Sequence, residues 1–271
     1  MPTTRTQRLR SPLNYYGGKY NLAKSIISQF TPHTTYIEPY CGAAHIYFTK
    51  PPSKIEILND INPDLMNFYH QLQTRPNDII KVTQRMPHNK KTHTLARKWR
   101  TTGPPLQQAI GYLALTRMSF GGRPTEQYFH SKPGGPNQTR VWVNTINNIP
   151  LTHNRIKNTI LHNQPAIKII QQYDSQDTLM YLDPPYMIGT RNAPNRYDYE
   201  MTDIDHQELL NTILTLKAHI LLSGYHHPLY DNLLKNWRHT EYNTYANMGT
   251  GKHRTLTHTL NKRTDVLWSN R

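Results

Sequence analysis

The chain of 271 residues has few cysteines, few acidic residues and no long apolar run, and each shortage excludes a class of protein. Its one cysteine, Cys41, excludes an internal disulfide and a cysteine-based zinc site. No run approaches the roughly 20 apolar residues of a membrane span, and the basic N-terminus is not followed by the apolar core of a signal peptide. We therefore expect a soluble, cytoplasmic protein without membrane contact.

Histidine is plentiful, but the spacing of a metal site is missing. The 15 histidines include no His-Glu-x-x-His or comparable ligand arrangement. Scattered histidines serve in packing or at the surface more often than as ligands. The sequence therefore predicts no bound metal.

The scarcity of acids leaves a large positive charge. There are 32 Lys and Arg against 17 Asp and Glu, a formal net charge of +15. Such an excess can serve solubility alone, but it also favours a polyanionic partner. Residues 79–125 and 242–264 contain no acid at all, so the positive charge is local. The basic residues of these stretches are Lys81, Arg85, Lys90, Lys91, Arg97, Lys98, Arg100, Arg117 and Arg123, and then Lys252, Arg254, Lys262 and Arg263.

The first part of the chain has the periodicity of an α/β protein. The apolar spacing predicts helices at 22–30 and 63–72 and strands at 36–40 and 55–58. A turn of small residues at 41–44 follows the first of these strands. This order of strand, turn, helix and strand is typical of a parallel α/β unit.

A basic, polar and turn-rich segment then interrupts the pattern. We assign residues 76–150 to an inserted domain, mainly helical and loop-rich, with a helix at 106–118. The α/β pattern returns afterwards, so residues 1–75 and 151–271 form one core domain. The remaining predicted elements of this core are helices at 166–173 and 205–216 and strands at 178–182, 219–222, 240–245 and 264–268.

The segment Asp183-Pro184-Pro185-Tyr186 follows the strand predicted at 178–182, where open parallel sheets place their ligand crevices. The two prolines fix φ and remove two backbone donors, so the corner is stiff and presents only acceptors. A carboxylate there can accept a hydrogen bond from an exocyclic amine and stabilise positive charge that develops on its nitrogen. Tyr186 offers a ring for a base swung out of a duplex. The alternative is an ordinary turn with an aspartate cap.

Two further positions follow the earlier strands. Gly42 follows the strand at 36–40, where a residue without a side chain lets a ligand approach the main chain. Asp60 follows the strand at 55–58, and an acid so placed can bind ribose hydroxyls. A lone aspartate after a strand is more often a cap, but its pairing with Gly42 favours a nucleotide-like cofactor.

A lysine and two tyrosines precede the first predicted helix, in the segment Asn14-Tyr15-Tyr16-Gly17-Gly18-Lys19. The lysine can meet a carboxylate, and the aromatic rings can pack on an adenine or methionine moiety. The segment is no Walker A loop, because Leu13 and Tyr20 stand where that motif needs Gly and Ser or Thr. A plain turn before a helix is the alternative.

Seven short segments, in order, resemble the Dam-like family of DNA adenine methylases: NYYGGK, YIEPYCGAA, ILNDIN, MSFGGR, DTLMYLDPPY, ILLSGYHHPLYDNLL and TDVLWSN. The resemblance covers nearly the whole chain outside the basic insert. It implies an α/β, Rossmann-like methyltransferase sheet with an inserted DNA-recognition domain. It also implies transfer of a methyl group from S-adenosylmethionine to the N6 amine of adenine in double-stranded DNA, with S-adenosylhomocysteine as the product.

The resemblance also assigns roles to residues, and the charge pattern adds others. The implied catalytic residues are Asp183, Pro184, Pro185 and Tyr186. The implied cofactor pocket contains Tyr15, Lys19, Glu38, Gly42, Asp60 and Asp183. The basic residues expected to contact DNA are Lys90, Lys91, Arg97, Lys98, Arg100, Arg117 and Arg123. We expect a monomer that associates with the nucleoid through DNA.

One departure from the family pattern concerns the first cofactor turn. The family usually has further glycines there, whereas this chain has Ala43 and Ala44. Alanine disfavours positive φ, so either these positions are helical or cofactor affinity is weakened. Three other functions stay open: methylation of the cytosine amine, an RNA amino-group methyltransferase, and a catalytically inactive DNA-binding regulator.

Overall fold

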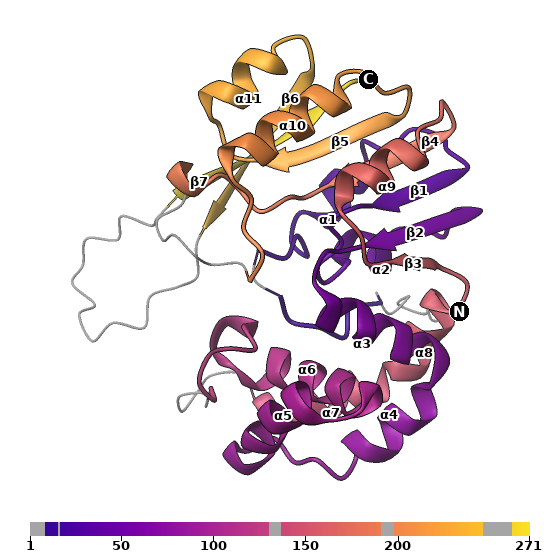
Figure 1. Ribbon diagram of the computed structural model, residues 1–271, viewed down its shortest axis with the longest axis vertical. Coiled ribbons are helices and arrows are strands. Elements are labelled where there is room, and N and C mark those ends of the chain that lie inside the picture. The colour runs from indigo at the N-terminus through magenta and orange to yellow at the C-terminus, as the bar shows by residue number, and fades with distance from the viewer. Residues whose placement is uncertain (1–8, 16, 130–136, 191–197, 246–261) are drawn as a thin grey trace, which may run out of the picture.

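A computed structural model describes residues 9–15, 17–129, 137–190, 198–245 and 262–271. Tyr16 and the basic residues Lys252 and Arg254 lie outside these ranges. Within them, the chain forms one sheet, two helical layers on it, and a helical block beside it (Figure 1).

The sheet has seven strands in the order β3-β2-β1-β4-β5-β7-β6. All neighbouring strands are parallel except β7, which runs antiparallel to both β5 and β6. The order reverses between β1 and β4, and such a switch point opens a crevice at the carboxyl ends of the strands. The strands are β1 (Thr35–Glu38), β2 (Ile55–Asn59), β3 (Ile160–His162), β4 (Thr178–Leu182), β5 (His219–Gly224), β6 (Arg238–Tyr245) and β7 (Lys262–Ser269).

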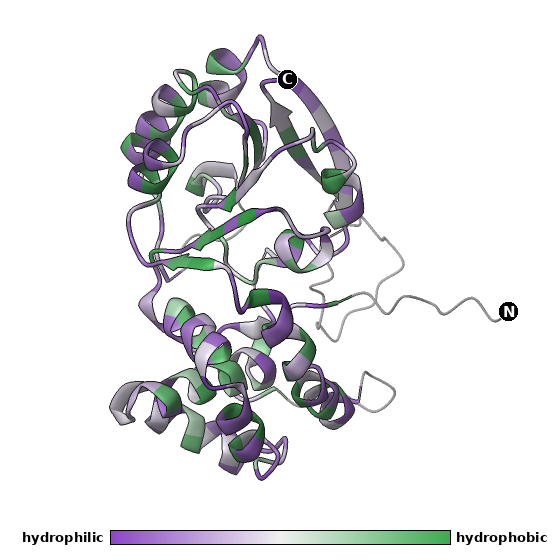
Figure 2. Cartoon of the chain, turned by 90° about the vertical axis from the view of Figure 1, so that its right-hand side faces the viewer, coloured by the Kyte–Doolittle hydropathy of each residue, from purple (hydrophilic) through white to green (hydrophobic). Residues whose placement is uncertain are grey.

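Helices cover both faces of this sheet. Every residue of β4 and β5 is buried, as expected for central strands between two helical layers. Figure 2 shows these central strands as mainly hydrophobic and the helices as mixed. One layer comprises α1 (Ala23–Ile27), α2 (His45–Thr49) and α3 (Pro63–Thr74). The other comprises α9 (Ala166–Gln172), α10 (Asp203–Ile213) and α11 (Pro228–Leu233).

The chain between α3 and β3 forms the helical block at the bottom of Figure 1. Helix α6 lies at its centre and packs on both α5 and α3. Helix α5 approaches α6 closely at Gly111, where an added Cβ would lie 2.6 Å from the Ala96 carbonyl oxygen. The helices of the block are α4 (Pro76–Thr83), α5 (Lys90–Thr102), α6 (Pro105–Met118), η1 (Phe120–Gly122), α7 (Gln138–Asn147) and α8 (Ile149–Ile156).

Side-chain caps set several helix starts near the crevice. Asn62 accepts hydrogen bonds from the backbone amides of Asp64 and Leu65, and Pro63 occupies the first turn of α3. Thr202 and Asp205 form a capping box at the start of α10. Both helices therefore begin at defined residues beside the crevice.

The Rossmann-like α/β prediction is confirmed, and all six predicted strands are present within a residue or two of their predicted bounds. The strand β3 and the helices α4, α5, α7, α8 and α11 were not predicted, and α2 was expected only from the order of elements, without bounds. The boundary of the insert at 76–150 stays a prediction. None of the helices in the described ranges is long and apolar enough to cross a membrane.

Candidate active site

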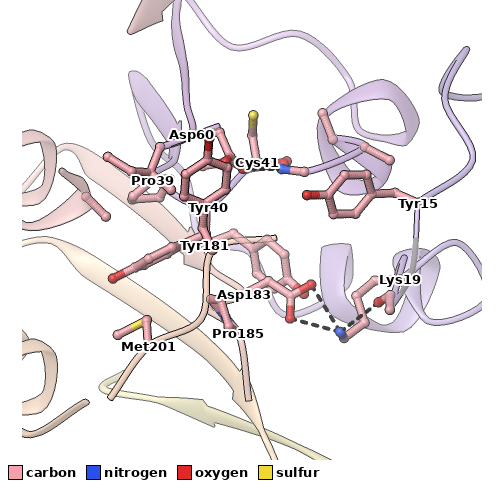
Figure 3. Close-up of a pocket in the computed structure, with 18 of the residues that line it drawn as sticks. Tyr15, Lys19, Pro39, Tyr40, Cys41, Asp60, Tyr181, Asp183, Pro185 and Met201 are labelled. Atoms are coloured by element: carbon pink, nitrogen blue, oxygen red, sulfur yellow. Dashed lines mark hydrogen bonds and ion pairs between the residues drawn. The ribbon is translucent and has the colours of Figure 1, made fainter. Parts of the chain in front are cut away.

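A cavity of about 420 Å³ opens at the carboxyl ends of β1, β2 and β4. Its walls come from the turn after β1, from Asp60 after β2, and from Asp183 and Pro185 after β4. The segment before α1 closes one side with Tyr15 and Lys19 (Figure 3). The switch point of the sheet is therefore the place where separate parts of the sequence meet.

Lys19 and Asp183 form an ion pair at one end of this cavity. The ammonium nitrogen of Lys19 lies 2.8 Å and 3.0 Å from the two carboxylate oxygens, and it also donates to the Gly17 carbonyl at 3.1 Å (Figure 3). Burial raises the pKa of Asp183, and the neighbouring Lys19 charge opposes that rise. The pair therefore favours the ionised carboxylate in a poorly hydrated place.

Tyr186 lies beside this pair. Its ring centroid is 4.7 Å from the Lys19 ammonium, and the ring of Tyr225 meets it edge-on at 4.6 Å. Its hydroxyl donates to Asp265 Oδ1 at 3.1 Å. The predicted catalytic tyrosine is thus buried and held by contacts from three parts of the chain.

Asp60 organises the turn after β1. One of its carboxylate oxygens accepts a hydrogen bond from the Gly42 amide at 2.9 Å, and the other accepts one from the Asn62 amide at 3.0 Å. Gly42 has φ +45°, and an added Cβ would meet the Tyr15 ring at 3.4 Å. Asp60 therefore fixes the loop that lines the cavity, and its remaining lone pairs face a ligand-sized space.

Glu38 is the last residue of β1 and is 2 % exposed. Burial raises the pKa of Glu38 to about 8, although the Tyr36 hydroxyl donates to it at 2.7 Å. Glu38 therefore holds a proton more readily than an exposed carboxyl group does. It can then donate a hydrogen bond into the cavity as well as accept one.

The lining of the cavity is acidic in a protein that is strongly basic. Six of the 17 acidic residues line it: Glu38, Asp60, Asp183, Glu200, Asp205 and Glu208. Apolar and aromatic side chains, among them Tyr40, Ile61 and Ile167, form other parts of the walls. Such a site suits a ligand with an aromatic part, hydroxyls and positive charge. Among the described residues, no group of three or more potential metal ligands occurs.

The turn after β1 resolves the question raised by its two alanines. Ala44 has φ 50° and ψ 41°, in the left-handed region, immediately before α2. Neither Ala43 nor Ala44 is part of a helix, so the first of the two alternatives does not hold, and weakened cofactor affinity stays a prediction. The loop needs this conformation because the chain turns sharply under the cavity, and the fold stabilises a strained alanine there.

We expect Ala44→Gly to stabilise the protein by about 0.5–1 kcal/mol, because glycine adopts positive φ without steric cost. The midpoint of thermal unfolding should rise by about 1–4 °C in calorimetry. Ala43→Gly is the matched control: Ala43 lacks positive φ, so this change should lower the midpoint. Equal shifts for the two variants would show that the backbone strain is absent.

The structure places four of the predicted DNA-contacting residues on the exposed side of α5: Lys90, Lys91, Arg97 and Lys98. No ion pair joins the three lysines to another residue in the described ranges. Lys90 and Lys91 occupy the first turn of α5, where positive charge opposes the helix dipole. Lys90 and Lys91 therefore destabilise the helix slightly, which favours a role for them in binding rather than in folding.

Of these four, Arg97 also donates to the Thr125 and Glu126 carbonyls, and the other three predicted DNA contacts are engaged within the protein as well. Arg100 donates to Asp64 at 2.7 Å, and Arg123 pairs with Glu126. Arg117 donates to the backbone carbonyls of Ser11 and Pro12 at 2.9 Å and 2.6 Å, and burial lowers its pKa to about 10. Arg117 thereby ties the N-terminal segment to α6.

All six residues predicted for the cofactor pocket line the same cavity, and so does Pro185. Their roles stay predictions. Residues from Pro165 to Ile167 and from Tyr199 to Met201 also line the cavity, and none of them was predicted to do so. The first of these segments follows β3, a short strand without a clear signal, whereas the second precedes the recognisable capping box of α10.

Comparison with known proteins identifies the family. A family model described as D12 class N6 adenine-specific DNA methyltransferase matches residues 15–248. A DNA adenine methylase of Vibrio cholerae serotype O1 is 25% identical over 191 residues, which cover 66% of this chain and 66% of the relative. The modification methylase StsI of Streptococcus sanguinis is 26% identical over 255 residues, covering 86% of this chain and 38% of the relative.

A third relative, the DNA N-6-adenine-methyltransferase of Escherichia phage P1, is 30% identical over 118 residues, covering 42% of this chain and 16% of the relative. The chain thus spans about two thirds of the Vibrio relative and less of the other two. The match of the family model covers most of the chain and confirms the resemblance drawn from the seven motifs. The chain belongs to the D12 class N6 adenine-specific DNA methyltransferase family.

Proposed function

We propose that this protein transfers a methyl group from S-adenosylmethionine to the N6 amine of adenine at a specific site in double-stranded DNA. The observation that carries the proposal is the Asp183 carboxylate, held on a stiff Pro-Pro corner in an acidic cavity at the switch point of the sheet. Family membership supports the same reaction.

The residues of the cavity fit S-adenosylmethionine. Among the residues that line the cavity, Asp60 would bind the ribose hydroxyls, Tyr40 and Ile61 would pack on the adenine ring, and Tyr15 and Lys19 would contact the amino acid part. The acidic lining matches the positive sulfonium and ammonium groups of this cofactor. When bound, the cofactor supplies an electrophilic methyl group.

The target amine would meet acceptors at the corner after β4. Adenine N6 is a weak nucleophile because its lone pair is delocalised into the ring. Asp183 and the Pro184 carbonyl can accept hydrogen bonds from its two N–H groups, which localises the lone pair and stabilises the charge that develops on nitrogen. S-adenosylhomocysteine would be the leaving group, and the methylated nitrogen would then release one proton to solvent. Tyr186 offers a face for the extruded base. No covalent enzyme intermediate is needed.

The base must share Asp183 with Lys19. In the free protein the ammonium contacts both carboxylate oxygens. Each oxygen has further lone pairs, so an amine can bind once Lys19 shifts to one of the two oxygens. Lys19 would keep Asp183 ionised until the base arrives. We further propose that the protein acts as a monomer, on DNA of the nucleoid in the cytoplasm.

We propose that the exposed side of α5 holds DNA phosphates through Lys90, Lys91, Arg97 and Lys98. Replacing the three lysines with alanine should weaken binding about equally for all DNA sequences. The plot of the logarithm of the association constant against the logarithm of the salt concentration should become less steep by up to about 2.7, or about 0.9 per lost phosphate contact. Fluorescence anisotropy with labelled duplexes from 50 to 200 mM salt measures this slope, with Lys157→Ala on the far end of the block as a control. An unchanged slope would exclude α5 from the DNA contact.

The proposed function is tested by calorimetry and by a transfer assay. We expect the protein to bind S-adenosylmethionine and to move its labelled methyl group to duplex DNA rather than to structured RNA. Failure to bind the cofactor would favour a DNA-binding regulator without catalytic activity. Preferential labelling of RNA would favour an RNA methyltransferase.

A further inference from the structure

The ring of Tyr186 contacts two residues from the next two strands beyond β4 in the sheet: Tyr225 after β5 and Asp265 in β7. Its hydroxyl donates to Asp265 Oδ1 at 3.1 Å, and the Tyr225 ring meets it edge-on with an interplanar angle of 78°. The register of β5 and β7 ends at the pair Gly224 and Val266, so Tyr225 and Asp265 are the next residues on these two strands. The antiparallel insertion of β7 therefore brings the end of the chain to the catalytic corner.

We infer that Asp265 is a positioning residue for the methyl transfer: by accepting the phenol hydrogen bond of Tyr186, it holds the far end of the ring at the place where the target base stacks. The inference rests on the proposed function. A tyrosine ring rotates about two side-chain bonds, and its hydroxyl is the farthest point from the backbone. A hydrogen bond at that point restricts the ring more than a contact near Cβ does.

The surroundings of the ring explain why this restraint matters. The Lys19 ammonium lies over the ring at 4.7 Å, and the Tyr225 ring forms a T-shaped pair with it, with the centroids 4.6 Å apart. Without the bond to Asp265, the ring could swing about its Cα–Cβ bond and move the stacked base relative to Asp183, with which Tyr186 also forms a hydrogen bond. A misplacement of about 1 Å can cost a reaction on the order of 100-fold in rate. Asp265 also contributes negative charge that raises the pKa of Asp183.

A set of variants separates the effect of the hydrogen bond between Tyr186 and Asp265 from the effect of the charge of Asp265. Asp265→Asn keeps an oxygen acceptor but removes the charge, whereas Asp265→Ala removes both. Tyr186→Phe keeps the ring but removes the hydroxyl. Glu241→Ala on the neighbouring strand β6 is the matched control, because its carboxylate pairs with His226 instead. Each variant is measured in single-turnover transfer, in cofactor calorimetry and in thermal unfolding.

We expect Asp265→Ala to lower the transfer rate roughly tenfold, with cofactor affinity unchanged. The fluorescence of 2-aminopurine at the target position should fall in parallel, because fewer bases are held in the pocket. Asp265→Asn should restore most of the rate at pH 8. In the Tyr186→Phe background, Asp265→Ala should have no further effect.

The inference is overturned if Asp265→Ala transfers methyl groups at the wild-type rate. It is also overturned if the variant loses as much rate in the Tyr186→Phe background, since Asp265 would then act by another route. If the wild type itself methylates no DNA, the proposed function fails instead. The contact between the two side chains is then still measured by their coupling in a double-mutant cycle of unfolding free energies.

Discussion

Asp183→Ala is expected to lower the rate of methyl transfer by about 10³-fold or more, while nonspecific DNA binding survives. The variant lacks the carboxylate that accepts the target amine and stabilises its developing charge. The DNA contacts proposed on α5 belong to another part of the fold and are unaffected. Single-turnover transfer and anisotropy with a labelled duplex measure the two properties separately. A normal transfer rate would show that the assignment of Asp183 is wrong.

The variant also leaves the Lys19 ammonium without its partner, and that side chain is only 9% exposed. Because the Asp183 side chain is 22% exposed, we expect a loss of only about 1–3 kcal/mol in unfolding free energy. The double variant Asp183→Ala, Lys19→Met should recover part of this stability but none of the activity. Asp177→Asn, on the exposed residue just before β4, is the control for changes of charge near this strand.

Lys19→Met is expected to make the transfer rate strongly dependent on pH. Burial raises the pKa of Asp183, and Lys19 is the largest influence that lowers it, so the pKa rises further without Lys19. Asp183 must be ionised to accept the amine, and the rate is therefore lost first at low pH. Relative to wild type, the loss at pH 6 should be roughly ten times larger than the loss at pH 9. Single-turnover rates across this range measure the effect.

Other groups near Asp183 have to be separated from this effect. Asp265, Tyr186 and Glu38 also face it, and the pKa of Glu38, about 8, lies in the same pH range. The comparison is therefore repeated in a Glu38→Gln background, which has no titration at this position. If Lys19 served only the cofactor, its loss would weaken cofactor binding equally at all these pH values.

The sheet could be predicted because its central strands are buried on both faces. Continuous apolar residues in β4 and β5, each followed by turn residues, mark such strands without ambiguity. The short β3 could not be found, because its three residues are partly exposed at an edge of the sheet. The motifs that contain Asp60 and Asp183 each begin with a predicted strand, and both residues indeed follow directly on strands, β2 and β4.

Helix α5 of the block was missed for a different reason. Helix α5 packs through Thr92, His93 and Ala96, residues without the large apolar side chains that reveal an amphipathic helix. These small or polar residues can pack against α6 because Gly111 lets the backbones of the two helices approach each other. The periodicity of α5 alone does not reveal this packing, because Gly111, the residue that permits it, lies on α6.

The residues that line the cavity were predicted more fully than the residues that hold the lining side chains in place. Tyr15, Lys19, Glu38 and Asp60 each belong to a motif whose chemistry suggests a ligand. Asp265 lies in the last of the seven motifs, but its contact with Tyr186 depends on the insertion of β7 between β5 and β6. Long-range pairing of this kind is set by the tertiary fold and has no local signal.

Mass spectrometry of nucleosides from duplex DNA treated with the protein and S-adenosylmethionine tests the central proposal most directly. We predict N6-methyladenine as the methylated nucleoside, formed by the wild type and absent with Asp183→Ala. N4-methylcytosine would show that the corner serves another base. DNA without any methylated nucleoside, under conditions where the cofactor binds, would contradict the proposed activity.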